Sequence, residues 1–220
     1  YTVVDLPTVL ATHITEVLKN HAFEFIGRQE TQNLLDAHAK SEPKVVEELI
    51  PSLISLGVVQ KVLQNLLKEL VSIRDLHTVL ETLADVSTIT KDPDLLTEHV
   101  RQSLSRQITR QYQTPDGVLP LITMNQDLEN QIATAIQDSG QGAYLGLNPN
   151  MAQAIINGID GMMEQFTINN YQPLLLCSPL IRPHVKKLVE RFIPNLVVLS
   201  HNEVAQDVRI EALGVVELSG

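Results

Sequence analysis

The sequence has one cysteine, few basic residues and no long apolar run, and each shortage argues against a class of function. Cys177 has no second cysteine in the chain to pair with, so no internal disulfide forms and a reducing compartment such as the cytoplasm is expected. The 16 lysines and arginines stand against 26 acidic residues. Nucleic acid is therefore not an expected partner, because phosphate binding needs clustered cations. No run approaches the roughly 18–20 apolar residues that cross a bilayer, so we expect no membrane contact from these residues.

Sequence signatures for cofactors and metals are also missing. Gly140 and Gly142 form only a G-x-G, position 145 is leucine, and no strand leads directly into the pair, so a dinucleotide site is not predicted. Among the seven histidines, His13 and His21 are eight residues apart, and no H-E-x-x-H or cysteine–histidine spacing occurs. The histidines are interpreted as solvated or capping residues, so we predict no metal ligands and no cofactor.

The N-terminal segment reads as a strand followed by an amphipathic helix. Residues 1–4 form an apparent strand with no nearby partner and no initiating methionine, so we expect the chain to be part of a longer protein. Asp5 is placed to cap a helix that runs up to Gly27. The next helix is expected to begin near Arg28, because glycine commonly ends helices.

The rest of the first half is predicted to be a bundle of helices. Apolar residues at 58–70 cover more than half of a helical circumference, which indicates a helix surrounded by its neighbours. Pro43 and Pro51 bracket a short helix before it. Asp75 and Asp92 are placed to cap two helices after it.

The pattern changes after Tyr112. Residues 114–117, Thr-Pro-Asp-Gly, are typical of a turn. Helical stretches then alternate with short apolar runs, which is the rhythm of an α/β unit. The predicted strands are 118–124, 174–177, 196–199 and 208–218, and the predicted helices lie near 126–137, 150–166 and 180–192.

These patterns predict a mixed α and α/β fold with three parts. Residues 1–27 would be the tail of a preceding subdomain, contributing one strand and one helix. Residues 28–110 would form an all-helical bundle domain, and residues 111–220 a small α/β domain. A linker near 107–113 would join the last two parts and could act as a hinge.

Several segments carry a resemblance that extends over essentially the whole chain. They include GVVQKVLQNLL at 57–67 and IRDLHTVLETLAD at 73–85, together with YTVVD at 1–5, ATH at 11–13, GRQE at 27–30, DPDL at 92–95 and VVLS at 197–200. In this order they resemble the cytoplasmic region of the flagellar export gate family, which has relatives in type III secretion injectisomes.

The resemblance implies a non-enzymatic docking platform within the cytoplasmic domain of a bacterial inner-membrane protein. Such a platform would bind flagellar export chaperones with their filament-type substrates and assist transfer to the membrane pore. Other export apparatus components and a homo-oligomeric ring are further expected partners. An injectisome gate would share this fold and handle different cargo, although the quoted segments look closer to the flagellar branch.

Three residues are candidate contacts under this resemblance. Thr12 lies in the ATH segment, on a helix that in relatives helps line a chaperone-binding cleft. The alternative is an ordinary helix residue whose hydroxyl bonds to the carbonyl of Thr8. Arg74 and Asp75 are candidate subunit contacts. Their alternative role is to fix the turn between two helices through a cap and an ion pair.

A different class of function would be a cysteine-dependent α/β enzyme. Cys177 follows a predicted strand, and His184 or His201 could serve as its base. The structural alternative has Cys177 as a small buried apolar residue, with Ser178 and Pro179 starting the next helix. The docking hypothesis, by contrast, predicts no catalytic residues.

Overall fold

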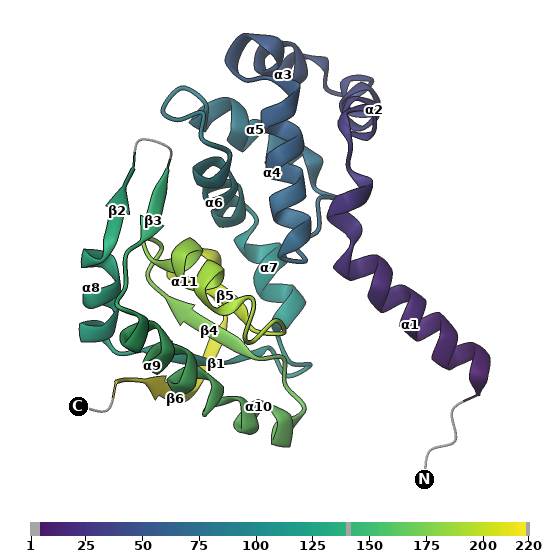
Figure 1. Ribbon diagram of the computed structural model, residues 1–220. Coiled ribbons are helices and arrows are strands. Elements are labelled where there is room, and N and C mark those ends of the chain that lie inside the picture. Colours follow the sequence, from purple (N-terminus) through teal and green to yellow (C-terminus); the bar gives the residue numbers. More distant parts are fainter. Residues whose placement is uncertain (1–4, 140–141, 219–220) are drawn as a thin grey trace. The chain divides into compact units, whose positions relative to one another are not determined.

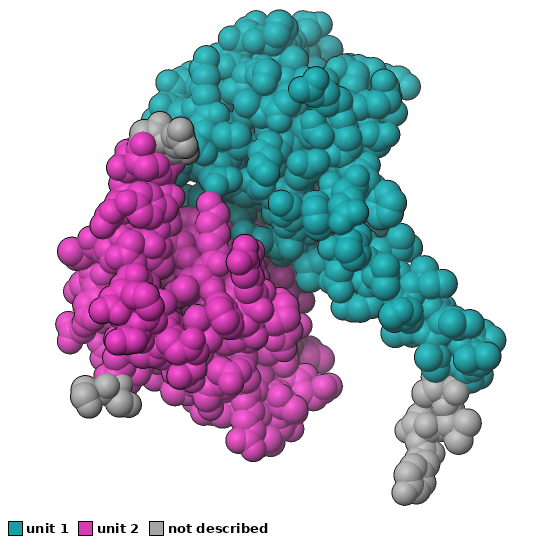
Figure 2. All heavy atoms as spheres, viewed as in Figure 1, with its two compact units in different colours: residues 1–104 teal, residues 105–220 magenta. Residues whose placement is uncertain are grey.

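The computed structural model describes residues 5–139 and 142–218. The expected strand at 1–4 and Gly140 of the G-x-G lie outside these residues. The chain forms two compact units, Tyr1–Leu104 and Ser105–Gly220 (Figure 2). Each unit has its own buried apolar residues. The expected linker near 107–113 is largely occupied by a helix, and the separation of 1–27 as a subdomain stays a prediction.

The described residues of the first unit form only helices and turns, as the sequence predicts for its bundle (Figure 1). Its elements are α1 (Leu6–Asn20), the 3₁₀ turn η1 (Ala22–Phe25), α2 (Arg28–Ala39), α3 (Pro43–Glu48), the π turn η2 (Leu49–Leu53), α4 (Leu56–Lys68), α5 (Leu76–Val86) and α6 (Pro93–Ser103).

Helix α4 is the centre of this unit, so the prediction of a surrounded helix is confirmed. It starts at Ser55, whose side chain accepts a hydrogen bond from the backbone N–H of Val58 at 3.4 Å. Helices α2 and α6 and the turn η1 pack against it. Four α4 side chains are fully buried: Val59, Val62, Leu63 and Leu66.

The predicted caps at three aspartates are confirmed. The carboxylate of Asp5 accepts from Thr8 N at 3.3 Å. Asp75 caps α5 and Asp92 caps α6 in the same manner. Short polar side chains at these positions satisfy backbone N–H groups that have no partner inside the helix.

Helix α1 is shorter than the sequence predicted and ends at Asn20. The chain then makes the turn η1, and Gly27 becomes the N-cap of α2, where its N–H donates to the carboxylate of Glu30 at 3.1 Å. The side-chain amides of Gln60 and Gln64 donate to the carbonyl of Ile26 at 3.2 and 2.8 Å. These bonds tie the end of η1 to helix α4.

The second unit is an α/β domain, as predicted, and its four-stranded sheet is parallel. The order β5-β4-β1-β6 places β1 between β4 and β6, and all neighbouring pairs are parallel. Its elements are α7 (Ser105–Tyr112), β1 (Val118–Met124), α8 (Gln126–Thr134), β2 (Ile136–Asp138), β3 (Ala143–Leu145), α9 (Pro149–Asp160), α10 (Met163–Asn169), β4 (Leu174–Cys177), α11 (Arg182–Val189), β5 (Val197–Ser200), η3 (His201–Glu203) and β6 (Arg209–Val216).

Two features of this unit differ from the sequence prediction. The helix expected at 150–166 is divided into α9 and α10, with Gly161 as the C-cap of α9. The expected helix at 126–137 ends at Thr134, and the chain continues into the antiparallel pair β2 and β3. The first difference lies at a glycine, and the second lies in a segment rich in polar residues and glycine, residues 137–142.

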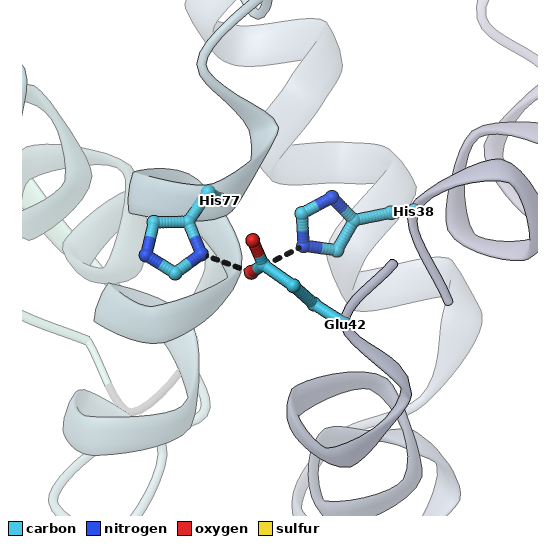
Figure 3. A group of neighbouring side chains, drawn as sticks. All are labelled: His38, Glu42 and His77. Carbon is cyan, nitrogen blue, oxygen red and sulfur yellow. Dashed lines mark hydrogen bonds and ion pairs between the residues drawn. The ribbon is translucent and has the colours of Figure 1, made fainter. Parts of the chain in front are cut away.

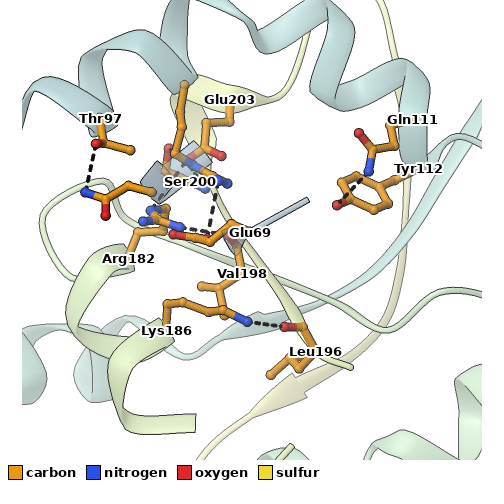
Figure 4. A network of polar contacts seen from close by, with 12 residues as sticks. Glu69, Thr97, Gln111, Tyr112, Arg182, Lys186, Leu196, Val198, Ser200 and Glu203 are labelled. Carbon is orange, nitrogen blue, oxygen red and sulfur yellow. Dashed lines mark hydrogen bonds and ion pairs between the residues drawn. The ribbon is translucent and has the colours of Figure 1, made fainter. Parts of the chain in front are cut away.

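A buried ion pair lies beside β5 (Figure 4). Arg182 Nε is 3.7 Å from Glu203 Oε1, and both side chains are almost fully buried. The same carboxylate oxygen accepts from the backbone N–H and the hydroxyl of Ser200 at 3.2 and 2.9 Å. Lys186 Nζ donates to the carbonyl of Leu196 at 3.0 Å. Arg182 and the two donors of Ser200 compensate the charge of Glu203, as a buried carboxylate requires.

Truncating the central helix tests the core of the first unit. Leu63→Ala removes a side chain that is fully buried in α4. We expect it to lower the free energy of unfolding by about 2–5 kcal/mol, because burial is lost and a cavity remains. Lys61→Ala, at an exposed position of the same helix, is the control and should change it by less than about 0.5 kcal/mol. Urea unfolding followed by circular dichroism measures both, and equal effects would contradict the packing described.

Candidate functional site

Helix α1 carries an apolar stripe that the rest of its unit does not cover. None of its residues is buried, and the helix projects from helices α2–α6 of the same unit (Figure 1). Exposed apolar side chains repeat at helical spacing, so the stripe faces one side. Its members are Leu6, Val9, Leu10, Ile14, Val17 and Leu18, which are 44–70% exposed.

Thr12 lies in an open hollow on α1. The hollow has a volume of about 520 Å³, and Val9, Thr12, His13 and Glu16 line it. The Thr12 hydroxyl donates to the carbonyl of Thr8 at 2.8 Å, as the structural interpretation predicted. The side chain is nevertheless exposed, so this bond and a contact with a partner are compatible. Apolar and charged groups therefore meet in a surface hollow next to the stripe.

Arg74 and Asp75 lie in the turn before α5, far along the chain from Thr12. The Asp75 carboxylate accepts from the backbone N–H and the hydroxyl of Thr78 at 3.1 and 2.8 Å. This confirms its capping role. The Arg74 backbone N–H donates to the Ser72 hydroxyl at 3.4 Å, and the Arg74 residue is exposed. Both residues are accessible to another molecule.

Cys177 is buried in the core of the second unit. Its residue has no exposed surface, and its Sγ lies 3.8 Å from the carbonyl oxygen of Leu199, to which it donates. Burial and the repulsion from Lys187 lower the pKa of His184, burial being the larger cause. A sequestered thiol fits the structural interpretation of Cys177, because an attacking cysteine must be reached by its substrate.

The structure brings together three side chains that sequence reasoning did not connect. His38, Glu42 and His77 place their ligand atoms within 4.8 Å of one another. His38 and Glu42 are four residues apart, which is a local signal, but His77 arrives from another helix. No spacing rule predicts that approach.

No described helix combines the length and the apolar character needed to cross a membrane.

Comparison with known proteins assigns the family. The FHIPEP family model matches residues 1–209. The chain belongs to the FHIPEP family. It is 46% identical to the flagellar biosynthesis protein FlhA of Bacillus subtilis over 218 residues, which is 99% of this chain and 32% of FlhA. The chain thus spans about a third of the length of this curated relative.

Solved structures of similar proteins share the fold. The structure of the Chlamydia pneumoniae CdsV protein superposes with a TM-score of 0.88 at 29% identity, over 95% of this chain and 60% of that one. The nonameric EscV cytosolic domain from the type III secretion system gives a TM-score of 0.80 at 34% identity, over 94% of this chain and 61% of that one. The FHIPEP fold of mixed helical and α/β parts is therefore established for this chain.

The buried thiol gives a direct test of the cysteine-enzyme alternative. In the native protein we expect Cys177 to react with an aromatic disulfide reagent far more slowly than after unfolding in guanidinium, because the reagent cannot reach a buried sulfur. Absorbance of the released thiolate measures both rates at neutral pH. A native rate equal to the unfolded rate would contradict the buried position and revive the enzyme hypothesis.

Proposed function

We propose that this chain is the cytoplasmic docking part of a flagellar type III export gate, within a bacterial inner-membrane protein. It binds export chaperones carrying filament-type substrates and assists their transfer to the membrane pore. The observation that carries the proposal is the exposed stripe of α1, adjoining the hollow that contains Thr12. The activity is binding, and no step of it needs a bond to be made or broken.

The physical support is the cost of leaving this stripe in water. Burying one large aliphatic side chain is worth about 1.5–3 kcal/mol, and six such side chains are exposed along α1. Contiguous apolar surface rimmed by polar groups is typical of a protein interaction site. Thr12, His13 and Glu16 supply such polar groups in the hollow. A partner helix or an apolar segment of a carrier matches this surface.

Sequence identity favours the flagellar branch over the injectisome branch. The flagellar FlhA proteins of Bacillus subtilis and Helicobacter pylori are 46% and 34% identical to this chain, and the EscV cytosolic domain from the type III secretion system, at 34%, stands at the lower end of that range. The same fold serves in both groups, so the injectisome gate remains the alternative function. The flagellar and injectisome functions are distinguished by which cargo the chain binds.

Ring formation is the second part of the proposal. The EscV cytosolic domain is nonameric, and the chain shares its fold over 94% of its own length. A closed ring uses two different surfaces of each subunit. We assign Arg74 and Asp75 to one of these surfaces, because both residues are exposed.

A bulky substitution at Thr12 tests the docking surface. Thr12→Met fills part of the hollow, so we expect binding of a flagellar chaperone with its substrate to weaken by about tenfold, or about 1.4 kcal/mol. Calorimetric titration of this chain, and of any longer form encoded by the source genome, measures the affinity.

The matched control is Thr15→Met on the same helix. Thr15 is also exposed and also donates to the carbonyl four residues earlier, at 2.7 Å, but it does not line the hollow. The Thr15→Met variant should bind the chaperone with the same affinity as the unaltered chain. Equal weakening by both variants, or tighter binding of injectisome chaperones than flagellar ones, would contradict the proposal.

A charge reversal tests the subunit contact. Arg74→Glu places two acidic residues side by side in the turn, and we expect it to reduce ring assembly of the full-length protein. Asp75→Asn keeps a capping side chain while removing the charge, so the fold should persist. Mass photometry reports the distribution of assemblies. Rings that form equally well with both variants would remove Arg74 and Asp75 from the interface.

A further inference from the structure

His38, Glu42 and His77 converge from three different elements of the helical unit (Figure 3). His38 lies in the last turn of α2, Glu42 is the N-cap residue of α3, and His77 is in the first turn of α5. Glu42 Oε2 contacts Nδ1 of His77 and lies 3.4 Å from Nε2 of His38. The two imidazole centroids are 6.1 Å apart. One carboxylate oxygen therefore sits between two ring nitrogens.

Hydrogen bonding accounts for only one side of this arrangement, the contact of Glu42 with His77. The Glu42 side chain makes no cap bond to α3, although it occupies the capping position. Nε2 of His38 is buried and has no hydrogen-bond partner in the structure, even with the Glu42 carboxylate nearby. A buried polar atom without a partner costs about 1–3 kcal/mol. The cluster therefore holds a nitrogen that is directed at a carboxylate and still unsatisfied.

The donor set matches a divalent transition-metal ion. Two imidazoles and one carboxylate are the ligands of many zinc sites that keep an open fourth position. With bonds of about 2.0–2.2 Å, tetrahedral ligand atoms lie roughly 3.3 Å apart. The separation of Nε2 of His38 from the Glu42 oxygen, 3.4 Å, already agrees with this value. Among the described residues, this is the one group of three such side chains with ligand atoms this close.

The distances between the other ligand atoms must change for a metal ion to bind, and the side chains that must move are the exposed ones. His38 is only 12% exposed, whereas Glu42 and His77 are 45% and 54% exposed. A metal ion bound here requires the contact between Glu42 and His77 to widen, and these two exposed side chains are the ones that can rotate to do so.

The backbone beneath the cluster is fixed by packing. Helix α3 packs against both α2 and α5. Leu35, Val45 and Val79, one from each of these helices, are buried. Positions held in this way lower the ordering cost of binding, because the ligands are already gathered before the ion arrives.

We propose that His38, Glu42 and His77 form a binding site for a divalent transition-metal ion such as Zn²⁺. His38 Nε2, a carboxylate oxygen of Glu42 and His77 Nδ1 are the protein ligands, and water completes the coordination. The ion links the ends of α2, α3 and α5, so it stabilises the helical unit. Because two of three donors are nitrogens, Mg²⁺ does not replace it.

The test is calorimetric titration of Zn²⁺ into the tag-free full chain, with Mg²⁺ titrated in parallel. We expect one Zn²⁺ per chain at micromolar or tighter affinity, a higher melting temperature with Zn²⁺, and no response to Mg²⁺. His77→Ala and Glu42→Gln should each weaken binding at least tenfold, since even outer partners of metal ligands are worth about 10–100-fold in affinity.

The chain contains its own control, the pair His21 and Glu24. Their side chains are 2.8 Å apart and exposed, and among the described residues no third ligand lies close to them. His21→Ala should therefore leave Zn²⁺ binding unchanged. Circular dichroism checks that every variant is folded, and Co²⁺ absorption of the unaltered chain reports tetrahedral coordination independently of the variants. Absence of micromolar Zn²⁺ binding, or equal loss with His21→Ala and His77→Ala, would overturn the proposal and leave an ion pair only.

Discussion

Burial of helix α4 is the constraint on which the helical unit depends. Its apolar residues cover so much of its circumference that no single neighbour can shield them, and α2, α6 and η1 all pack against it. Each buried valine or leucine contributes about 1.5–3 kcal/mol. The free energy gained by burying α4 therefore outweighs the intrinsic conformational preferences of the shorter helices around it. The position of His38 follows from the packing of α2 against this centre, whereas α5, which carries His77, packs against α6 and α3.

Helix α1 differs from the other helices because its apolar side chains are not buried. Its end is tied to α4 through η1 and the two glutamine amides that bond Ile26, yet its own apolar side chains stay exposed. An isolated helix of 15 residues is marginal in water unless something packs on its apolar face. The same exposure that weakens α1 alone gives a partner a large gain on binding. This links the stability of the helix to its proposed function.

Local signals in the sequence predicted local structure well. The caps at Asp5, Asp75 and Asp92 and the strand at 118–124 were all predicted, because each depends on residues adjacent in the chain. Features set by tertiary packing were not predictable in this way. The pair β2 and β3 is short and carries little apolar pattern, and the approach of His77 to Glu42 spans 35 residues of sequence. Without knowledge of how helices pack, separate histidines give no sign of a shared site.

The central claim is that a carrier docks on α1. Hydrogen–deuterium exchange of this chain, with and without a flagellar chaperone carrying its substrate, measures this directly. Residues 6–20 should exchange rapidly when the chain is alone, because none of them is buried, and should become strongly protected in the complex. Protection confined to other elements, with α1 still exchanging freely at saturation, would contradict the account.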